Sequence, residues 1–311
     1  MAQFKALVDK LLTNVSNAYV PDGYISEMIL PKLSVVQSSG KIGKYGSEHL
    51  RIVPTIMGGR GGARRLDAVS RSDSSYFIES HGLEDIVTKE DYRNVEQPFD
   101  AEKDSTLTLT TVLWLGKEKA LADVLMDPAV ITQGQTLSGT SQFNDYTNSD
   151  PIGVAVAAKK TIRAACGVPP DTMIADWAVA ETLRYHPKIL RNLGYADNRA
   201  GSLTNDELAK ALGMRRFLVG NVSYNSAKEG QTDVLSPLWA KDVIFCVSPD
   251  KPTKLQKALG YLVEIAGQGA RKVYKEATFN PPDAVKILVQ DEYDMLIVDT
   301  KCAYLVQDSI A

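Results

Sequence analysis

The spacing of apolar residues predicts a short amphipathic helix near the start of the chain. Between Phe4 and Val15, apolar residues recur three or four positions apart, which gives a helix with a single apolar stripe. The segment that follows contains Pro21, Gly23 and Pro31, which interrupt helical structure. Because a helix separated from its body must still bury its apolar stripe, we expect it to dock either on its own domain or on a neighbouring subunit.

Two extended runs follow and together predict a long hairpin. Residues 34–53 carry three glycines, which disfavour a helix and suit an irregular strand, and residues 74–87 are again extended in pattern. Legs of about 12 residues would reach about 40 Å, whereas a compact domain of this length has a radius of gyration near ~20 Å. A two-stranded ribbon is marginally stable alone in water. We therefore expect the hairpin to extend beyond its own body and to lie along another surface.

The pattern changes to a long helix from Pro98 to Pro128. Acidic residues come early and lysines later, which suits the helix dipole. Residues 106–112, TLTLTTV, alternate as a strand would, which competes with the helical pattern and predicts an irregular start of the helix. The predicted apolar stripe consists of Leu109, Val112, Leu113, Lys117, Ala120, Leu121, Val124 and Leu125.

The middle of the chain carries local helix signals. A helix over 151–166 is indicated by Asp150 as N-cap, Pro151 at the first helical position and Gly167 as a stop. A short buried strand over 171–176 leads into a helix that we expect to end at Pro187.

A further helix over 204–214 opens with a capping box of Thr204 and Glu207. Strands dominate the last third of the chain. The predicted strand runs are 215–225, 242–249, 258–265, 272–279, 284–290 and 295–306. The fold class expected from this order is α+β.

Composition limits the classes of function. The 311 residues suffice for two domains or for one domain with insertions, and 44% hydrophobic and 23% charged residues are ordinary globular usage. A net charge of −3 argues against a dedicated duplex-DNA binder. Cys166, Cys246 and Cys302 are widely spaced and are expected to be reduced thiols. No apolar run is long enough to cross a membrane, and the first residues do not form a secretion signal.

Familiar catalytic and ligand-binding patterns do not fit. The Gly/Arg stretch lacks the GxxxxGK[ST] spacing of a phosphate loop, and Arg64 stands where a dinucleotide fingerprint needs its third glycine. His81 and Glu84 are too few to predict a metal site. Cys166 is interpreted as a packing residue and His186 as a cap at a helix C-terminus. We therefore predict no catalytic, cofactor-binding or metal-binding residue.

The segment 56–72, IMGGRGGARRLDAVSRS, is the candidate functional feature. It holds Arg60, Arg64, Arg65 and Arg71 at the predicted hairpin tip. These cations could form ion pairs with another subunit, could stay solvated, or could contact nucleic-acid phosphates. No aromatic residue is interleaved for base stacking, and Asp67 dilutes the charge, so the sequence favours contacts between subunits.

Three stretches carry a resemblance to a known family. They are VPDGYISEMILPKLSVVQSSGKIGKYGSEHLRI (20–52), LTNDELAKALGMRRFLVGNVSYNSAKEGQ (203–231) and SPLWAKDVIFCVSP (236–249). The sequences of these stretches resemble those of the major capsid proteins of tailed bacteriophages, which have the Hong Kong 97-type fold. The order of arm, hairpin, long helix, mixed helix-and-strand centre and final strands resembles that family as well.

The resemblance implies an α+β capsid fold in four parts. These are an N-terminal arm (1–33), an extended loop (34–97), a peripheral domain (98–167 and 273–311) and an axial domain (168–272). The arginine segment would be the tip of the extended loop and would lie over an adjacent subunit.

The resemblance also implies a structural protein, not an enzyme, with no cofactor. Copies would assemble into the hexamers and pentamers of an icosahedral shell that encloses a double-stranded DNA genome, contacted non-specifically. Further partners would be scaffolding, portal and decoration proteins, with no membrane. The location would be the virion, with assembly in the bacterial host cytoplasm. Two alternatives stay open: an encapsulin-like nanocompartment shell, and a soluble oligomeric enzyme of another family.

Overall fold

A computed structural model describes most of the chain. The described residues are 7–45, 52, 70–94, 100–194, 203–228, 230–252, 257–266, 271–278 and 283–311. The predicted hairpin tip, with Arg60, Arg64 and Arg65, lies outside them.

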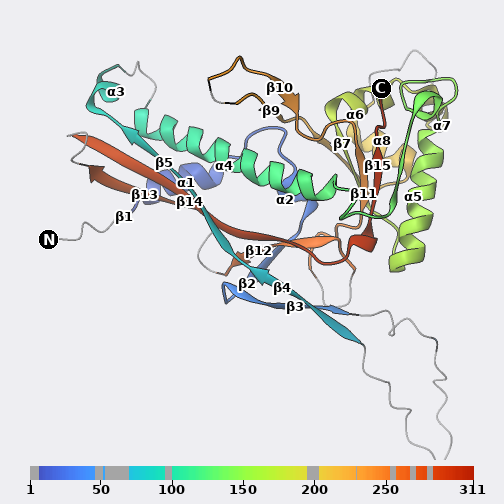
Figure 1. The fold of residues 1–311 in the computed structure, drawn as a ribbon, viewed down its shortest axis with the longest axis horizontal. Helices are drawn as coiled ribbons and strands as arrows, with labels where there is room; N and C mark the ends of the chain where they lie inside the picture. Colours follow the sequence, from blue (N-terminus) through green and yellow to red (C-terminus); the bar gives the residue numbers. More distant parts are fainter. Residues whose placement is uncertain are drawn as a thin grey trace, which may run out of the picture.

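A six-stranded sheet forms one half of the molecule (Figure 1). Its strands run in the order β1 (Leu7–Val8), β13 (Arg271–Thr278), β14 (Ala284–Ile297), β12 (Gly260–Ile265) and β2 (Lys32–Val35), and β5 (Glu79–Val87) also pairs with β14. All pairs are antiparallel except β12 with β2. The sheet therefore joins strands from both ends of the chain.

Two helices cover one face of this sheet, α1 (Lys10–Ala18) and α4 (Ala101–Leu125). Leu12 of α1 and Leu109 of α4 are buried in one cluster with Val273, Ile287 and other apolar side chains of the sheet. The amphipathic N-terminal helix is thus confirmed, and Leu12 is buried against its own chain. It begins at Lys10, however, and not near Phe4, because the Asp9 carboxylate caps the backbone N–H groups of Leu11 and Leu12.

The long helix α4 is confirmed and is continuous through 106–112. The strand-like alternation there does not prevail. Thr106 and Thr110 are buried within the helix, and each donates its hydroxyl to the carbonyl four residues earlier, so that no buried hydroxyl is left without a partner. The predicted stripe is only partly right: Leu109, Lys117, Leu121 and Leu125 are buried.

The sequence analysis assigned the other part of the buried stripe to a neighbouring ridge of the helix that is exposed. Val112, Ala120 and Val124 are exposed. Trp114 and Glu118 are buried instead, since the N-terminal segment and Trp239 pack against that side of the helix.

The other half of the molecule is built on a five-stranded sheet. Its order is β6 (Gly134–Thr136), β15 (Ala303–Gln307), β11 (Val243–Cys246), β7 (Thr172–Asp176) and β8 (Arg216–Gly220). Helices α5 (Pro151–Cys166), α6 (Trp177–Arg184), α7 (Pro187–Asn192) and α8 (Asn205–Leu212) pack around it and share its large apolar core. The three cysteines are free and buried in this structure, in agreement with the prediction of thiols.

Most local helix signals in this half were predicted correctly. Gly167 ends α5 in the left-handed conformation, at φ 83°, and the Thr204–Glu207 capping box opens α8. The helix before Pro187 ends at Arg184, as expected, and Pro187 itself begins α7, because proline fits the first helical position.

Two predicted strand runs are divided in the structure. The run 295–306 contains the end of β14, a 3-10 turn (Thr300–Cys302) and then β15, so the chain passes from one sheet to the other. The run 215–225 contains β8 and the short β9 (Ser223–Asn225), which pairs with β10 (Leu235–Pro237) in a separate hairpin. The remaining short helices are α2 (Ser26–Ile29), α3 (Lys89–Asn94) and a 3-10 helix (Gly139–Ser141).

Candidate assembly surface

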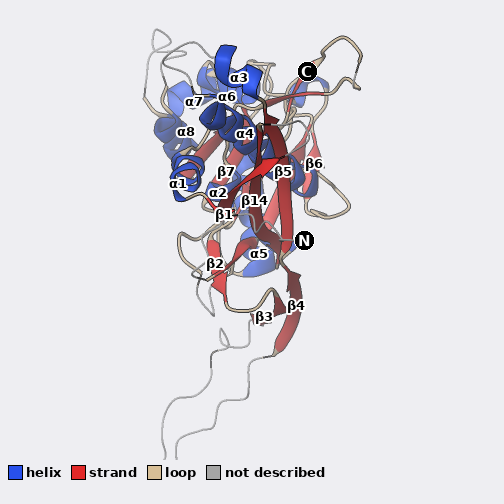
Figure 2. Ribbon diagram, turned by 90° about the vertical axis from the view of Figure 1, so that its left-hand side faces the viewer, coloured by secondary structure: helices blue, strands red, loops and turns tan. Residues whose placement is uncertain are grey.

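A two-stranded ribbon projects from the body of the molecule. Strands β3 (Ser39–Tyr45) and β4 (Arg71–Phe77) pair antiparallel over seven residues each and extend beyond the two main sheets (Figures 1 and 2). The ribbon also contacts its own body, since Tyr76 is buried in an apolar cluster with Tyr261 and others, and Nζ of Lys44 lies 2.9 Å from Oδ1 of Asp299. Within the described residues, each of these strands has only the other as its strand partner. The predicted hairpin is confirmed for β3 and β4 alone. The rest of its predicted second leg, 79–87, is β5 and pairs with β14 in the six-stranded sheet, so the hairpin is shorter than the sequence suggested.

Two glycines of β3 make room for large side chains of β4. A Cβ on Gly40 would lie 2.7 Å from the Tyr76 hydroxyl, and the phenol donates a hydrogen bond to the Gln37 carbonyl at 3.3 Å. A Cβ on Gly43 would lie 2.6 Å from Nε of Arg71. The glycine density read from the sequence thus has a packing cause: side chains of one strand lie across the bare backbone of the other.

Arg71 is the one candidate arginine among the described residues. Its side chain is exposed, and its Nε lies 2.8 Å from Oδ1 of Asp73 on the same strand. The contact of Arg71 with another subunit stays a prediction, as do the contacts of Arg60, Arg64 and Arg65, which lie outside the described residues.

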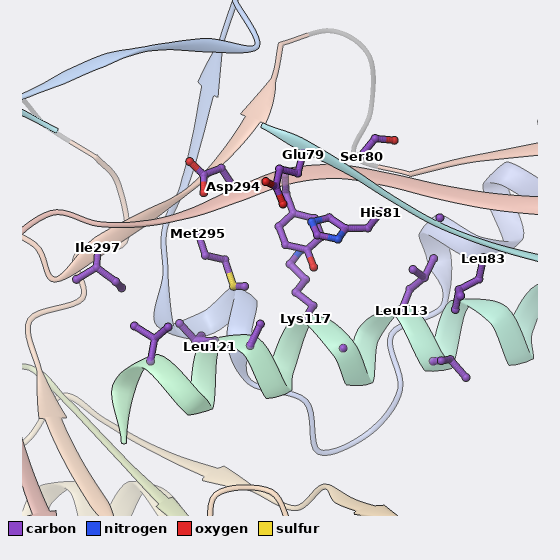
Figure 3. A pocket seen from close by; sticks show the side chains of 16 residues that line it. Glu79, Ser80, His81, Leu83, Leu113, Lys117, Leu121, Asp294, Met295 and Ile297 are labelled. Carbon is purple, nitrogen blue, oxygen red and sulfur yellow. The ribbon is translucent and has the colours of Figure 1, made fainter. Parts of the chain in front are cut away.

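A groove with a cavity volume of about 810 Å³ lies between α4 and the strands β5 and β14 (Figure 3). The helix contributes a ridge of small and apolar residues four positions apart, and Leu83 of β5 adds to the apolar lining. The ridge consists of Val112, Gly116, Ala120 and Val124. The residues of α4 that were predicted to be buried but are exposed therefore lie together along this groove.

A buried lysine lies beneath this groove. The Lys117 side chain is 1% exposed, and its Nζ is 2.8 Å from Oε1 of Glu27 and 4.6 Å from the ring centroid of Tyr293. Burial raises the pKa of Glu27, but the ammonium groups of Lys117 and Lys32 outweigh this and lower it below the ordinary value. Glu27 also lies 2.8 Å from Nζ of Lys32, so one carboxylate serves both ammonium groups.

The rim of the groove is acidic. Glu79 is exposed, and Oδ2 of Asp294 accepts a hydrogen bond from the Phe77 backbone N–H at 3.0 Å. Figure 3 shows both carboxylates on the strand side of the groove, near His81, which stacks on Tyr293 at 4.5 Å. Across the described ranges, no group of His, Cys, Asp and Glu is arranged to hold a metal ion.

A buried carboxylate fixes the N-terminal segment beside the groove. Glu118 accepts hydrogen bonds from the backbone N–H of Ile25 (3.1 Å), the backbone N–H of Ser26 (2.8 Å) and Nε1 of Trp239 (2.9 Å). Burial raises the pKa of Glu118 even though these donors act to lower it. One side chain thus joins α4, the N-terminal segment and the loop before β11.

A buried serine–histidine contact elsewhere does not form a catalytic pair. Nε2 of His186 is 2.9 Å from Oγ of Ser149, and Nδ1 accepts a hydrogen bond from the Lys188 backbone N–H at 3.2 Å. With Nδ1 as acceptor, the proton of neutral His186 is on Nε2 and is donated to Ser149, so the ring cannot take the serine proton. His186 is the N-cap of α7, which corrects the predicted C-terminal cap.

Acid is expected to destabilise the protein through His186. Burial lowers its pKa to about 4, so the unfolded chain, with a histidine pKa near 6.5, binds more protons than the native state between these values. This contribution to stability is complete above about pH 6.5, and about 2–3 kcal/mol is lost as the pH falls towards 4. Urea unfolding across this range should show the loss in the wild type. His186→Asn, which can keep the cap, should lack that part of the pH dependence. If the free energy of unfolding falls equally with pH in both proteins, His186 is not the cause of the loss.

Similar proteins are phage proteins of comparable length. The chain is 28% identical over 269 residues to the major capsid protein of Burkholderia phage BcepMu, which covers 84% of both chains. The fold matches the crystal structure of a phage-related protein from Bordetella bronchiseptica RB50, with a TM-score of 0.74, 24% identity and 98% of both chains covered. It also matches the capsid structure of cyanophage P-SCSP1u, with a TM-score of 0.58, 10% identity and 99% and 90% of the two chains covered.

No protein-family model matches the chain. Among the described residues, no helix has both the length and the apolarity required to cross a membrane.

Proposed function

We propose that this chain, a homologue of phage major capsid proteins, is itself the major capsid protein of a tailed phage. Many copies form a closed icosahedral shell that encloses double-stranded DNA. The observation that carries the proposal is the similarity to a phage major capsid protein over 84% of both chains. The projecting β3–β4 ribbon and the open groove beside α4 support it, because both leave surface that a single copy does not cover.

The proposed architecture is the Hong Kong 97-like fold in the four parts named above, with subunits in hexamers and pentamers. The matching capsid structure supports a capsid fold in general. The two sheets offer a physical basis for the two domains. In the structure α5 and β15 pack with the five-stranded sheet, whereas β12 belongs to the six-stranded sheet with α4. The limits near 167 and 273 therefore do not coincide with the division between the two sheets.

The physical mechanism is burial distributed over many neighbours. A two-stranded ribbon is marginal by itself and gains stability by lying on another surface. Each such contact is modest, but a subunit that engages several neighbours at once gains from high effective concentration, and a closed symmetric shell leaves no free edges. The role is structural and the location is the virion. Contacts with scaffolding, portal and decoration proteins, with packaged DNA, and assembly in the host cytoplasm belong to the proposal.

Sedimentation and negative-stain microscopy of the expressed protein test this function. Closed particles of megadalton mass are expected, whereas a soluble enzyme would sediment as a small oligomer. Nuclease-protected DNA in particles from infected cells would separate a phage capsid from an encapsulin-like compartment, which holds protein cargo. A purified protein that stays monomeric at high concentration would overturn the proposal.

Replacing Arg60, Arg64 and Arg65 together with alanine is expected to reduce particle yield and leave the subunit folded. These cations are proposed to form ion pairs with a neighbouring subunit, so their loss weakens association and not the core. Particle yield and circular dichroism should be compared with Arg191→Ala, an arginine of α7. A normal yield from the triple variant would show that the arginines do not contribute to assembly.

A further inference from the structure

We propose that Cys166 and Cys302 form a modification site at which a peroxide joins the two thiols as a disulfide within one subunit. Cys166 is the last residue of α5, and Cys302 is the last residue of the 3-10 turn between β14 and β15. The site does not depend on the proposed function, because both residues lie in one chain. Only the time of oxidation, after release of a virion from the cell, rests on that function.

The two thiols lie together although they come from distant parts of the chain. Helix α5 packs against the 3-10 turn, and both cysteines are buried in the same apolar core. The Cys302 thiol donates a hydrogen bond to the sulfur of Cys166. Sγ of Cys166 also lies 3.3 Å from the carbonyl oxygen of Val168, to which its own thiol donates. Thiols in such contact are close enough for side-chain rotation, rather than a change of fold, to bring the sulfurs to bonding distance.

The third cysteine shows what an isolated buried thiol looks like in the same core. Cys246 lies on β11, is fully buried, and has no hydrogen bond with either of the other thiols in the described part of the chain. Burial raises the pKa of the Cys246 thiol, so it stays protonated and inert. The core thus contains one isolated thiol and one pair of thiols in contact.

Cys166 is the thiol that a peroxide reaches first. Residues 163–165 and 167–169 on both sides of it are exposed, and Cys166 is buried just beneath them at the end of α5. The hydrogen bond from Cys302 lowers the pKa of Cys166 below its ordinary value, although burial opposes this, and the same bond raises the pKa of Cys302. Because the thiolate is the nucleophile, Cys166 attacks the peroxide and Cys302 resolves the product.

The reaction consumes one hydrogen peroxide and releases two water molecules. The Cys166 thiolate attacks one peroxide oxygen and the O–O bond breaks. The leaving hydroxide takes up the proton that Cys166 gave off, which yields water and a sulfenic acid on Cys166. The Cys302 sulfur then attacks the sulfur of the sulfenic acid. The S–S bond forms, the S–O bond breaks, and the departing hydroxide leaves with the Cys302 proton as the second water. Both sulfurs are oxidised and the peroxide is reduced.

The disulfide fastens the crossover between the two sheets to α5. At the 3-10 turn the chain leaves the six-stranded sheet and enters the five-stranded sheet. A bond between Cys166 and Cys302 closes a long loop, and cross-links of long loops restrict the unfolded chain most. The cytoplasm keeps thiols reduced, whereas disulfides persist outside the cell. The subunit therefore folds with reduced thiols and gains stability once it is exposed to an oxidising medium.

Peroxide treatment of the native wild-type protein tests the site. The treated protein is denatured, its remaining thiols are blocked with N-ethylmaleimide, and its peptides are mapped without reduction. We expect one peptide pair joined through Cys166 and Cys302 and one blocked thiol, Cys246. Dithiothreitol should restore all three thiols. The oxidised protein should melt about 5–10 °C above the reduced protein, because the unfolded chain is restricted.

Two single variants serve as matched controls. Cys302→Ala removes the resolving thiol, so peroxide should leave a sulfenic acid on Cys166 that dimedone traps, with no rise in melting temperature. Cys246→Ala removes the isolated thiol and should form the same disulfide as the wild type. The peptide map of the wild type decides the question even if either variant fails to fold.

Several results would overturn the inference. Three blocked thiols after a peroxide dose that oxidises the same thiols in urea would do so, as would a disulfide that includes Cys246 or joins two copies. A bond between Cys166 and Cys302 that forms in urea but not in the native protein would also count against it. Particle formation, which tests the proposed function, is not used in these measurements, so either can fail without the other.

Discussion

Replacing Glu118 with alanine should lower the free energy of unfolding by about 3–5 kcal/mol, since a buried acceptor with several donors is lost. The carboxylate is fully buried and accepts hydrogen bonds from two backbone N–H groups and the Trp239 indole. Alanine leaves all three donors without an acceptor and opens a cavity beside α4. The change should also release the segment around Ile25, which Glu118 connects to the helix.

Glu118→Gln is the matched control for this variant. Glutamine has nearly the same shape and keeps one acceptor oxygen, so it should cost less than half as much as alanine. Urea unfolding monitored by tryptophan fluorescence gives the free energies, and proteolysis at the N-terminal segment reports its release. Equal stability of the alanine variant and the wild type would mean that the donors find other partners and that Glu118 does not hold the segment.

The sequence predicted the elements whose signals are local. Asp150, Pro151 and Gly167 lie within one helix or next to it, and so do Thr204 and Glu207, so their roles follow from backbone hydrogen bonds that a few residues satisfy. The ribbon was predicted for a related reason. Its glycines and polar alternation exclude a helix, and its neighbours in the chain are also its neighbours in the sheet.

The parts that were missed depend on contacts between distant residues. The buried side of α4 is determined by Trp239 and the N-terminal segment, more than 90 positions away from Glu118. Periodicity alone cannot choose between two adjacent ridges of a helix. A signal was nevertheless available: Lys117 and Glu118 lie within an apolar stripe, and charged groups at such positions are buried only when they have partners. The groove could not be predicted, because its two walls come from different elements.

Replacing Arg271 with methionine should destabilise the protein by about 3–5 kcal/mol, because it leaves Asp291 as an unpaired buried charge. The two residues face each other across β13 and β14, with Nη2 3.6 Å from Oδ2 and side chains 6% and 2% exposed. Nη1 of Arg271 also donates to the Ser16 carbonyl at 2.9 Å, and the guanidinium lies 5.2 Å from the Trp114 ring centroid. One arginine thus connects the sheet to both α1 and α4.

The double variant Arg271→Met with Asp291→Leu distinguishes charge pairing with Asp291 from the other contacts of Arg271. Removing both charges avoids the unpaired carboxylate, so most of the stability lost in the single variant should return. The Ser16 carbonyl still loses its donor, so α1 should remain less protected from hydrogen exchange than in the wild type. If the double variant is no more stable than Arg271→Met alone, the cost lies in the lost contacts with Ser16 and Trp114, and the attachment of α1, not charge pairing within the sheet, is what Arg271 provides.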